Sequence, residues 1–376
     1  MASAPTPDDV AAACAAAARP LASALAAVNG LARRLAEADW PAGLVEEGGQ
    51  FHRVLVLPGV GAVRMTRTHE AAAHLSDRMA TLQMLSTMAA LPFAVPVPLT
   101  EVVGEADGLP AGMAAVVQEY LPGEAHPPHT GEVPVLRELC RTLAGIDTAP
   151  LRPHLGPPFA YRGPWTAEKV AAVQAVPSML AASHGPGLWT DGSHDGPGGA
   201  VSVDRWAETV ATLTTTHTAW TEDPVVPPSL VHGDLAGHNM RWQRSAAGGV
   251  GGDGESGSDG DDAERWHLTG ILDWDLAAVW DPALNPVYLA LWHGEEKLEA
   301  IARDADEALR GRVWLGWMAL ETIYDASLRE GPASEIPPAN WPQLLRKVLP
   351  RIERATAALD RWRVEHAPAF SAVDKR

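Results

Sequence analysis

The amino-acid sequence predicts an α+β protein in which a small, strand-rich unit precedes a larger, mostly helical one. Three short apolar stretches near residues 43–47, 53–57 and 61–66 are separated by turns rich in glycine and proline, as in an antiparallel sheet. The second half of the chain carries long segments of helical periodicity instead. Thirteen of the fourteen tryptophans follow residue 160, so we expect the larger core in that half.

The strand-rich unit is expected to span residues 43–121 and to include one long helix and a fourth strand. The helix should run from about Thr68 to Leu91, and the strand should lie within "MAAVVQEYLPGE", which ends in a Pro-Gly turn. The apolar stripe of this helix consists of Leu75, Met79, Leu82 and Leu85. Residues 1–42 are rich in alanine and predict a separate helical segment.

The remaining residues, 122–376, form the predicted helical unit. Its helices are expected near residues 133–147, 165–182, 202–220, 284–309, 311–329 and 341–364. Within it, residues 245–264 are rich in Gly, Ser and Asp and carry six acidic side chains and no basic one. Such a segment has nothing apolar to bury, so we expect a disordered insertion.

Charge and composition exclude several classes of protein. The formal net charge of −18 argues against nucleic acid as a partner. The two cysteines, Cys14 and Cys140, do not form a metal-ligand pair or a disulfide framework. We find neither a basic leader segment nor an apolar run long enough to span a membrane. We therefore predict a cytoplasmic protein that does not associate with membranes.

The stretch "LVHGDLAGHNM", residues 230–240, concentrates polar groups behind an apolar strand. Asp234 is followed five residues later by Asn239, and a second apolar strand, "GILDWD", leads to Asp273. Two carboxylates and a carboxamide at adjacent loop ends suit phosphoryl transfer. One carboxylate can orient an acceptor hydroxyl and take its proton, while the other two groups hold Mg²⁺.

Asn239 and Asp273 are 34 positions apart in the sequence. Without the 20 residues of the insertion, 14 remain, which is about the length of two short strands and a turn. The sequence therefore predicts a hairpin that brings both candidate metal ligands together.

On these motifs the chain resembles the aminoglycoside and macrolide phosphotransferase family, relatives of the protein kinases. The resemblance rests on "HGDLAGHN", "ILDWD" and "WDPALN", and extends to "EEGGQFHRVLV", "AVRMT" and "VVQEYLPGE". It implies a two-lobed, protein-kinase-like fold, with residues 43–121 as the nucleotide-binding N-lobe and 122–376 as the C-lobe. It also implies Mg²⁺ as cofactor and ATP or GTP as phosphoryl donor.

The resemblance also assigns roles to individual residues. Asp234 would be the catalytic carboxylate, and Asn239 and Asp273 the metal ligands. The residues that would contact the nucleotide are Gly48, Gly49 and Gln50 over the phosphates, and the backbone of Glu119, Tyr120 and Leu121 beside the adenine.

Two positions depart from the family pattern. The family usually has a phosphate-binding Lys on the third strand, but this chain has no Lys before Lys169 and the matching residue is Arg64. An Arg can still pair with phosphate. Its acidic partner on the following helix is left unassigned between Asp77 and Glu70. The second departure is Asn285, which stands where the family often has an acid.

We therefore predict an O-phosphotransferase that acts on a hydroxyl of a small molecule, such as an aminoglycoside or macrolide antibiotic, as a monomer or homodimer. One alternative is a pseudokinase that binds nucleotide and acts by interaction. Another is a metal-dependent phosphohydrolase with His232, Asp234 and His238 as ligands and Asp273 and Asp275 as further ligands. The acidic run in residues 295–307 is either a solvated helix face or a wall that receives cationic acceptors.

Overall fold

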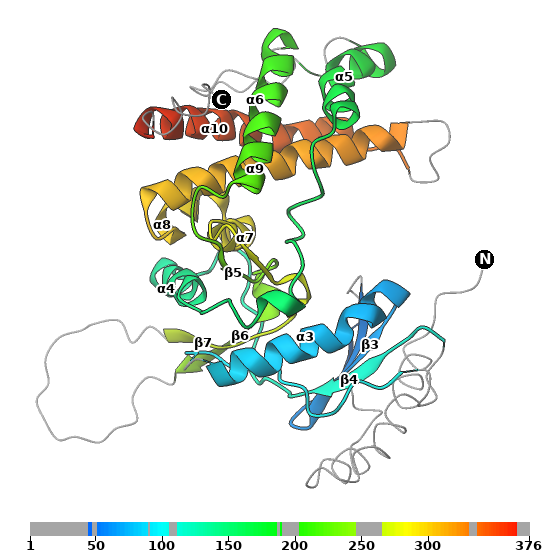
Figure 1. Ribbon diagram of the computed structural model, residues 1–376, viewed down its shortest axis with the longest axis vertical. Coiled ribbons are helices and arrows are strands. Elements are labelled where there is room, and N and C mark those ends of the chain that lie inside the picture. The colour runs from blue at the N-terminus through cyan, green and yellow to red at the C-terminus, as the bar shows by residue number, and fades with distance from the viewer. Residues whose placement is uncertain are drawn as a thin grey trace, which may run out of the picture. The chain divides into compact units, whose positions relative to one another are not determined.

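The computed structural model, shown in Figure 1, describes residues 44–46, 51–88, 91–104, 111–185, 189, 203–245, 265–330 and 337–366. Three predicted features lie outside the described residues. They are the N-terminal helical segment, the glycine loop with Gly48, Gly49 and Gln50, and residues 246–264 of the insertion. Within the described residues, no helix is both long enough and apolar enough to cross a membrane.

Contacts between residues divide the chain into two compact units. The first unit combines the chain up to Thr130 with Asp147–Gly156 and Asp234–Ala277, and the second contains the remaining residues. The sheet lies in the first unit and most of the helices lie in the second, so the fold class is α+β, as predicted. The lobe boundary at residue 122 stays a prediction.

The first unit contains a four-stranded antiparallel sheet in the order β1-β2-β3-β4. Its strands are β1 (Leu44–Glu46), β2 (His52–Leu57), β3 (Gly61–Thr66) and β4 (Ala115–Gln118). The turn between β2 and β3 is closed by a hydrogen bond from Val60 N to Leu57 O at 2.9 Å. Gly59 has φ of 70° in this turn, a conformation that favours glycine. The three predicted N-terminal strands are confirmed.

Helix α3 (His69–Met88) follows β3, and its N-terminus is capped by Thr68, whose Oγ1 accepts from Ala71 N at 3.1 Å. The predicted apolar stripe is buried, and it consists of Leu75, Met79, Leu82 and Leu85. Figure 1 shows the helix lying along the sheet. The stripe therefore provides much of the core of this unit.

A hairpin of β6 (Met240–Ser245) and β7 (Arg265–Ile271) also belongs to the first unit. The strands pair antiparallel from Met240 opposite Ile271 to Ser245 opposite Arg265, which confirms the predicted hairpin on both sides of the insertion. Ala94 hydrogen-bonds to β7, donating to Thr269 O at 2.8 Å and accepting from Ile271 N at 3.0 Å. These bonds hold the hairpin to the rest of the unit.

The second unit consists mainly of helices, with a short ribbon of β5 (Ser229–Val231) paired to β8 (Ala278–Trp280). The helices are α4 (Val133–Ala144), α5 (Ala167–His184), α6 (Val203–Glu222), α7 (Leu284–His293), α8 (Leu298–Ile301), α9 (Ala305–Ser327) and α10 (Trp341–Glu365). Helices α9 and α10 pack closely at Gly316, where a Cβ atom would lie 2.2 Å from the Cβ of Ala355. Only glycine permits that approach.

The predicted helices over 284–309 and 311–329 are wrong in their boundaries. Helix α7 ends at His293, and the next residue, Gly294, has φ of 116°, a conformation that is strained for other residues. Helix α9 begins earlier than predicted because the Asp304 side chain accepts from Glu307 N at 2.7 Å, and the Glu307 carboxylate accepts from Arg303 N at 2.7 Å. It then continues through Gly311, whose missing side chain leaves room for Leu298.

Candidate active site

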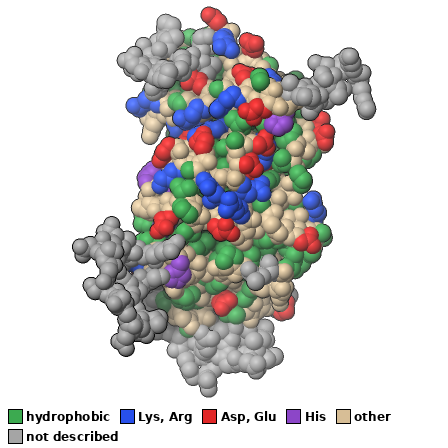
Figure 2. Space-filling model, turned by 90° about the vertical axis from the view of Figure 1, so that its left-hand side faces the viewer, with side chains coloured by type: hydrophobic (Ala, Val, Ile, Leu, Met, Phe, Trp, Pro, Cys, Tyr) green, Lys and Arg blue, Asp and Glu red, His purple; other side chains and the backbone are tan. Residues whose placement is uncertain are grey.

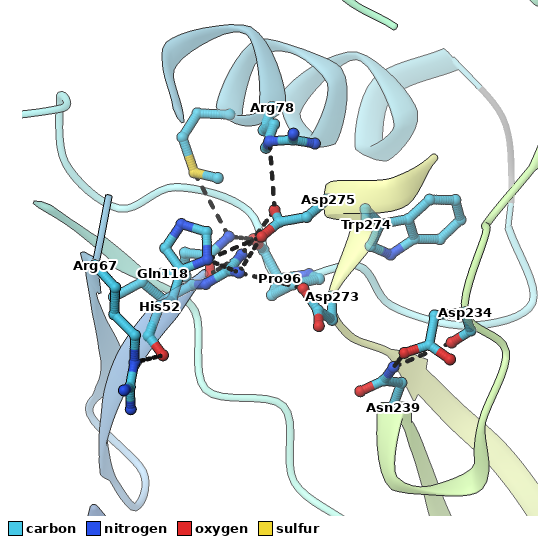
Figure 3. A network of polar contacts seen from close by, with 12 residues as sticks. His52, Arg67, Arg78, Pro96, Gln118, Asp234, Asn239, Asp273, Trp274 and Asp275 are labelled. Atoms are coloured by element: carbon cyan, nitrogen blue, oxygen red, sulfur yellow. Dashed lines mark hydrogen bonds and ion pairs between the residues drawn. The ribbon is translucent and has the colours of Figure 1, made fainter. Parts of the chain in front are cut away.

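The loop between β5 and β6 brings Asp234 and Asn239 together, as Figure 3 shows. Gly233 precedes Asp234 with φ of 86°, so the turn into the loop favours glycine. The short 3₁₀ turn η5 (Gly237–Asn239) then directs Asn239 back. Its Nδ2 donates to Asp234 O at 3.0 Å and to Asp234 Oδ2 at 2.9 Å. The carboxylate of Asp234 is thereby held in one orientation.

Burial raises the pKa of the Asp234 carboxyl above its usual range, although His238 and the hydrogen bond from Asn239 act in the opposite direction. A carboxylate with a raised pKa accepts a proton more readily than one exposed to water. Asp234 therefore combines a fixed orientation with increased basicity.

Asp273 lies two residues beyond the end of β7 and has φ of 57° and ψ of 62°. This left-handed conformation is uncommon for a residue other than glycine and often accompanies a functional site. Leu272 N donates to Asn239 O at 2.7 Å, so the two candidate metal ligands are tied to the same end of the hairpin. The predicted hairpin is therefore present between Asn239 and Asp273, and their role as metal ligands stays a prediction.

The donors at this end of the hairpin suit a magnesium ion. The Asp273 carboxylate and the Asn239 carboxamide oxygen are hard oxygen donors, which Mg²⁺ prefers. The Asp273 side chain is 47% exposed and already accepts a cationic donor, Arg64 Nη2, at 3.2 Å.

Arg64, on β3, is 7% exposed and lies within a network of polar side chains (Figure 3). Its guanidinium makes a two-pronged contact with Asp275, with Nη2 donating to Oδ2 at 2.7 Å and Nη1 to Oδ1 at 3.4 Å. Nη1 also contacts Gln118 Oε1 at 3.5 Å, and Nη2 lies 3.1 Å from His52 Nδ1. The acidic partner that the sequence left unassigned is therefore Asp275, not a residue of α3.

Asp275 is almost fully buried, with 4% of its side chain exposed, so it does not lie in a solvated turn. Burial alone would raise its pKa, but the Arg64 guanidinium and the hydrogen bond from His52 hold the pKa of this carboxyl far below its usual range. Sequence reasoning missed His52 and Gln118. Strand register offered a signal, because Arg64 lies diagonally across the β2–β3 pair from His52.

The segment after β4 contains the residues expected beside an adenine ring. The backbone N–H of Glu119 donates to Val97 O at 2.9 Å, which engages this N–H within the unit. Glu119 is exposed, Tyr120 is half-buried and Leu121 is buried. Beyond them, Glu124 and Trp242 exchange backbone hydrogen bonds, which anchor the segment to β6.

In the second unit, Asn285 fixes the strand that precedes the loop with Asp234. Its Nδ2 donates to Leu230 O at 2.9 Å and its Oδ1 accepts from His232 N at 3.1 Å. Both Asn285 and His232 are fully buried. An acid at position 285 could accept from His232 N but could not donate to Leu230 O while ionised. Asn285 therefore makes both of these hydrogen bonds, which an ionised acid at this position could not do.

The acidic run is partly solvated, since Glu296, Glu299 and Asp304 are exposed, but it is not an unpaired wall. Glu307 is 0% exposed, and the carboxylates of this run bind neighbouring arginines. The ion pairs are Glu295 with Arg351 and Arg354, Glu299 with Arg312, Asp306 with Arg310, and Glu307 with Arg303. Figure 2 shows basic and acidic side chains side by side on one face of the molecule. Most of this negative charge is compensated within the unit.

The phosphohydrolase alternative required a cluster of metal-binding side chains around His232, Asp234 and His238. Within the described residues, no group of three or more His, Cys, Asp or Glu side chains is placed to hold a metal ion. The site instead contains a fixed carboxylate, two oxygen donors and a nearby arginine. That combination suits phosphoryl transfer.

Comparison with known proteins agrees with this assignment. The model of the phosphotransferase enzyme family, APH, matches residues 44–252, more than half of the chain. The chain therefore belongs to this family, and the protein-kinase-like fold class implied by the resemblance follows from that membership. No curated protein matches the sequence.

Among solved structures, the chain is similar to the GDP and kanamycin complex of APH(2")-IIia, with 15% identity, a TM-score of 0.44, and coverage of 87% of this chain and 93% of that one. It is also similar to the apoenzyme of macrolide 2'-phosphotransferase MphH from Brachybacterium faecium. There the identity is 18%, the TM-score 0.40, and the coverage 84% of this chain and 99% of that one. The family assignment rests on the family model alone.

Proposed function

We propose that the protein transfers the γ-phosphoryl group of ATP or GTP to a hydroxyl group of a small molecule. The observation that carries the proposal is the pairing of Asp234 with Asn239, next to the hairpin end that holds Asp273, in a member of the phosphotransferase family. A general base and two oxygen donors for a divalent cation are the groups that this reaction needs.

In the proposed reaction, the acceptor hydroxyl oxygen forms a bond to the γ-phosphorus as the bond from that phosphorus to the bridging oxygen breaks. The nucleoside diphosphate leaves, and Asp234 takes the hydroxyl proton. Asn239 orients the Asp234 carboxylate through its 2.9 Å hydrogen bond. Mg²⁺ held by Asn239 and Asp273 would neutralise charge on the phosphates.

The nucleotide would be held by groups of the first unit. Arg64 takes the position of the family's lysine and is proposed to contact the phosphates. The carbonyl of Glu119 and the backbone of Tyr120 and Leu121 are proposed to meet the base. The loop with Gly48, Gly49 and Gln50, which lies outside the described residues, is proposed to cover the phosphates.

For the acceptor, family resemblance suggests an antibiotic such as an aminoglycoside or macrolide. Acidic side chains within residues 295–307 form ion pairs with arginines. These ion pairs support an uncharged or weakly charged acceptor over a polycation. Carboxylates such as Glu295 and Glu299 are already compensated by arginines, so a polycation would have to displace these partners.

A screen for nucleoside diphosphate release tests the proposal. Purified protein would be incubated with Mg²⁺, with ATP and GTP each as donor, against aminoglycosides, macrolides, capreomycin-like peptides and common metabolites. Acceptor-dependent release that is lost in Asp234→Asn is the expected result. Nucleotide binding without turnover on any acceptor would instead identify a pseudokinase. A tightly bound transition metal without nucleotide affinity would identify a phosphohydrolase.

A further inference from the structure

Two carboxylates on the loop after β7 differ sharply in their surroundings. The Asp273 side chain is 47% exposed and makes one contact with Arg64, at 3.2 Å. The Asp275 side chain is 4% exposed and lies 2.7 Å from the same guanidinium. Between them, Trp274 is buried and its indole N–H donates to Ile271 O at 3.0 Å. The short turn η6 (Trp274–Leu276) therefore holds the two carboxylates in different environments.

The contacts of Asp275 are numerous and come from three elements. Arg64 on β3 contacts both carboxylate oxygens, and His52 Nδ1 on β2 lies 2.9 Å from Oδ2. Arg78 on α3 brings its Nε to 3.9 Å from Oδ1. Burial and the nearby Arg64 charge lower the pKa of His52, which favours its neutral form. The Asp275 carboxylate is thus the anion shared by Arg64 and Arg78.

Helix α3 does not supply an acid to Arg64. Of the two acids considered from the sequence, Glu70 is exposed, and Asp77 binds His154 Nδ1 at 2.9 Å instead. The α3 residue that reaches the network is Arg78, a cation. A counter-ion for Arg64 must come from elsewhere in the unit, because an isolated buried charge is costly.

We propose that Asp275 is a positioning residue, the permanent counter-ion that fixes Arg64 for contact with the nucleotide phosphates and so leaves Asp273 free to bind the metal. The proposal rests on the function proposed above. It assigns different tasks to the two carboxylates. Asp275 makes the close, buried, two-pronged contact that orients the guanidinium, whereas Asp273 makes one longer contact from a half-exposed position, which a cation can replace.

Loss of the Asp275 charge has two consequences under this proposal. Arg64 keeps only Asp273 as an anionic partner, so it is drawn toward the carboxylate that the metal needs. It also loses the contact that orients its planar guanidinium. Both effects weaken the binding of a magnesium–nucleotide complex, and neither affects a nucleoside without phosphates.

The test is a double-mutant cycle on nucleotide binding, which requires no acceptor. Calorimetric titration with Mg·ATP, Mg·ADP and adenosine would be compared for the wild type, Asp275→Asn, Arg64→Gln and the double variant. We expect each single substitution to weaken Mg·ATP binding about tenfold or more, with the double variant no weaker than the weaker single variant. The affinity for adenosine should stay unchanged in all three variants.

Asp77→Asn is the matched control, because it removes an acid one residue from Arg78 without touching the network. It should bind all three ligands as the wild type does. The neutral double variant also covers the case in which Asp275→Asn does not fold, since removing both charges leaves no uncompensated ion at the pair. In that case Arg64→Lys is measured in place of Asp275→Asn. We expect Arg64→Lys to bind Mg·ATP more weakly than the wild type and to bind adenosine normally.

Several outcomes would overturn the assignment. If the effects of Asp275→Asn and Arg64→Gln add, Asp275 acts independently of Arg64, for example as a metal ligand. Equal loss of adenosine binding would show that Asp275 only maintains the fold. Normal Mg·ATP binding in Asp275→Asn would show that Arg64 needs no counter-ion here. If the wild type bound adenosine but no phosphorylated nucleotide, the proposed function itself would fail.

Discussion

The side-chain amide of Asn239 donates to both the backbone carbonyl and the carboxylate of Asp234, at 3.0 and 2.9 Å. The same residue accepts from Leu272 N through its backbone carbonyl at 2.7 Å. Asn239 thus links the loop with Asp234 to the start of the Asp273 loop. A rotation of its side chain would disturb both the proposed base and the proposed metal site.

Asp234→Asn should reduce kcat by roughly a hundredfold or more, because an amide cannot accept the proton of the acceptor hydroxyl. The substitution is nearly isosteric, so the melting temperature and the Kd for Mg·ATP should change little. Steady-state kinetics with an acceptor found in the screen would measure the effect. Near-normal turnover would remove Asp234 from the mechanism.

Asp273→Ala should abolish turnover and weaken Mg·ATP binding, because it removes the more exposed of the two carboxylates near Arg64. The dependence of ATP affinity on magnesium concentration is the measurement. Binding of adenosine serves as the control and should be unaffected. An unchanged magnesium dependence would show that the metal is held elsewhere.

The hairpin could be predicted from the sequence because it depends on local patterns. Alternation and turn residues locate β2, β3 and β6, and the spacing of Asn239 and Asp273 follows from two paired strands. The stripe of α3 was predicted for the same reason. In each case, the signal lies within one stretch of chain.

The contacts of Asp275 could not be predicted, because its partners are far away in sequence. Arg64 is 211 positions from it, and no periodic pattern connects β3 with the turn η6. The ion pairs of the acidic run could not be predicted for the same reason. Its composition resembles that of a solvated face, but its arginine partners lie on other elements, such as Arg351 on α10. Charge compensation depends on tertiary structure.

The acidic run gives a prediction about stability. Glu295 binds Arg351 Nε at 2.7 Å and Arg354 Nη2 at 2.9 Å and so ties η7 (Glu295–Lys297) to α10. Glu295→Gln should lower the free energy of unfolding by about 1 kcal/mol, since the pair is only partly shielded from solvent. Glu296→Gln, at the exposed neighbouring position, is the control.

The KM for the acceptor should be the same in Glu295→Gln, Glu296→Gln and the wild type. A raised KM for a cationic acceptor in Glu295→Gln alone would show that this carboxylate binds the acceptor after all. Chemical denaturation and steady-state kinetics on the same preparations separate the two interpretations.

Residues 246–264 should be dispensable for catalysis. Ser245 and Arg265, which flank them, are paired directly across the hairpin, so a two-residue Asn-Gly turn can join the strands. Closing a long flexible loop costs only about 0.6 kcal/mol more for each doubling of its length, so the shortened protein should be as stable as the wild type or slightly more so. The kcat should be retained. Loss of activity or folding would show that the segment packs against the molecule.

The pH dependence of stability should be governed in part by His217 in the second unit. Its ring is 2% exposed and packs between the rings of Tyr161, at 5.7 Å, and Trp317, at 4.8 Å. Burial, followed by the positive charge of Lys169, lowers the pKa of His217 to about 4. The folded protein therefore keeps this ring neutral down to mildly acidic pH.

Because the folded pKa is depressed, protonation favours the unfolded chain, in which histidine titrates near its ordinary value. Stability should be unaffected by His217 above about pH 6.5 and should fall as the pH drops toward about 4. Between pH 7.5 and pH 5 we expect a loss of about 2 kcal/mol from this residue. His217→Gln cannot titrate, so its stability should decline less over this range than that of the wild type. Urea unfolding at both pH values measures the difference, with the same substitution at the exposed His184 as control. Equal acid sensitivity of wild type and His217→Gln would show that other groups cause the decline.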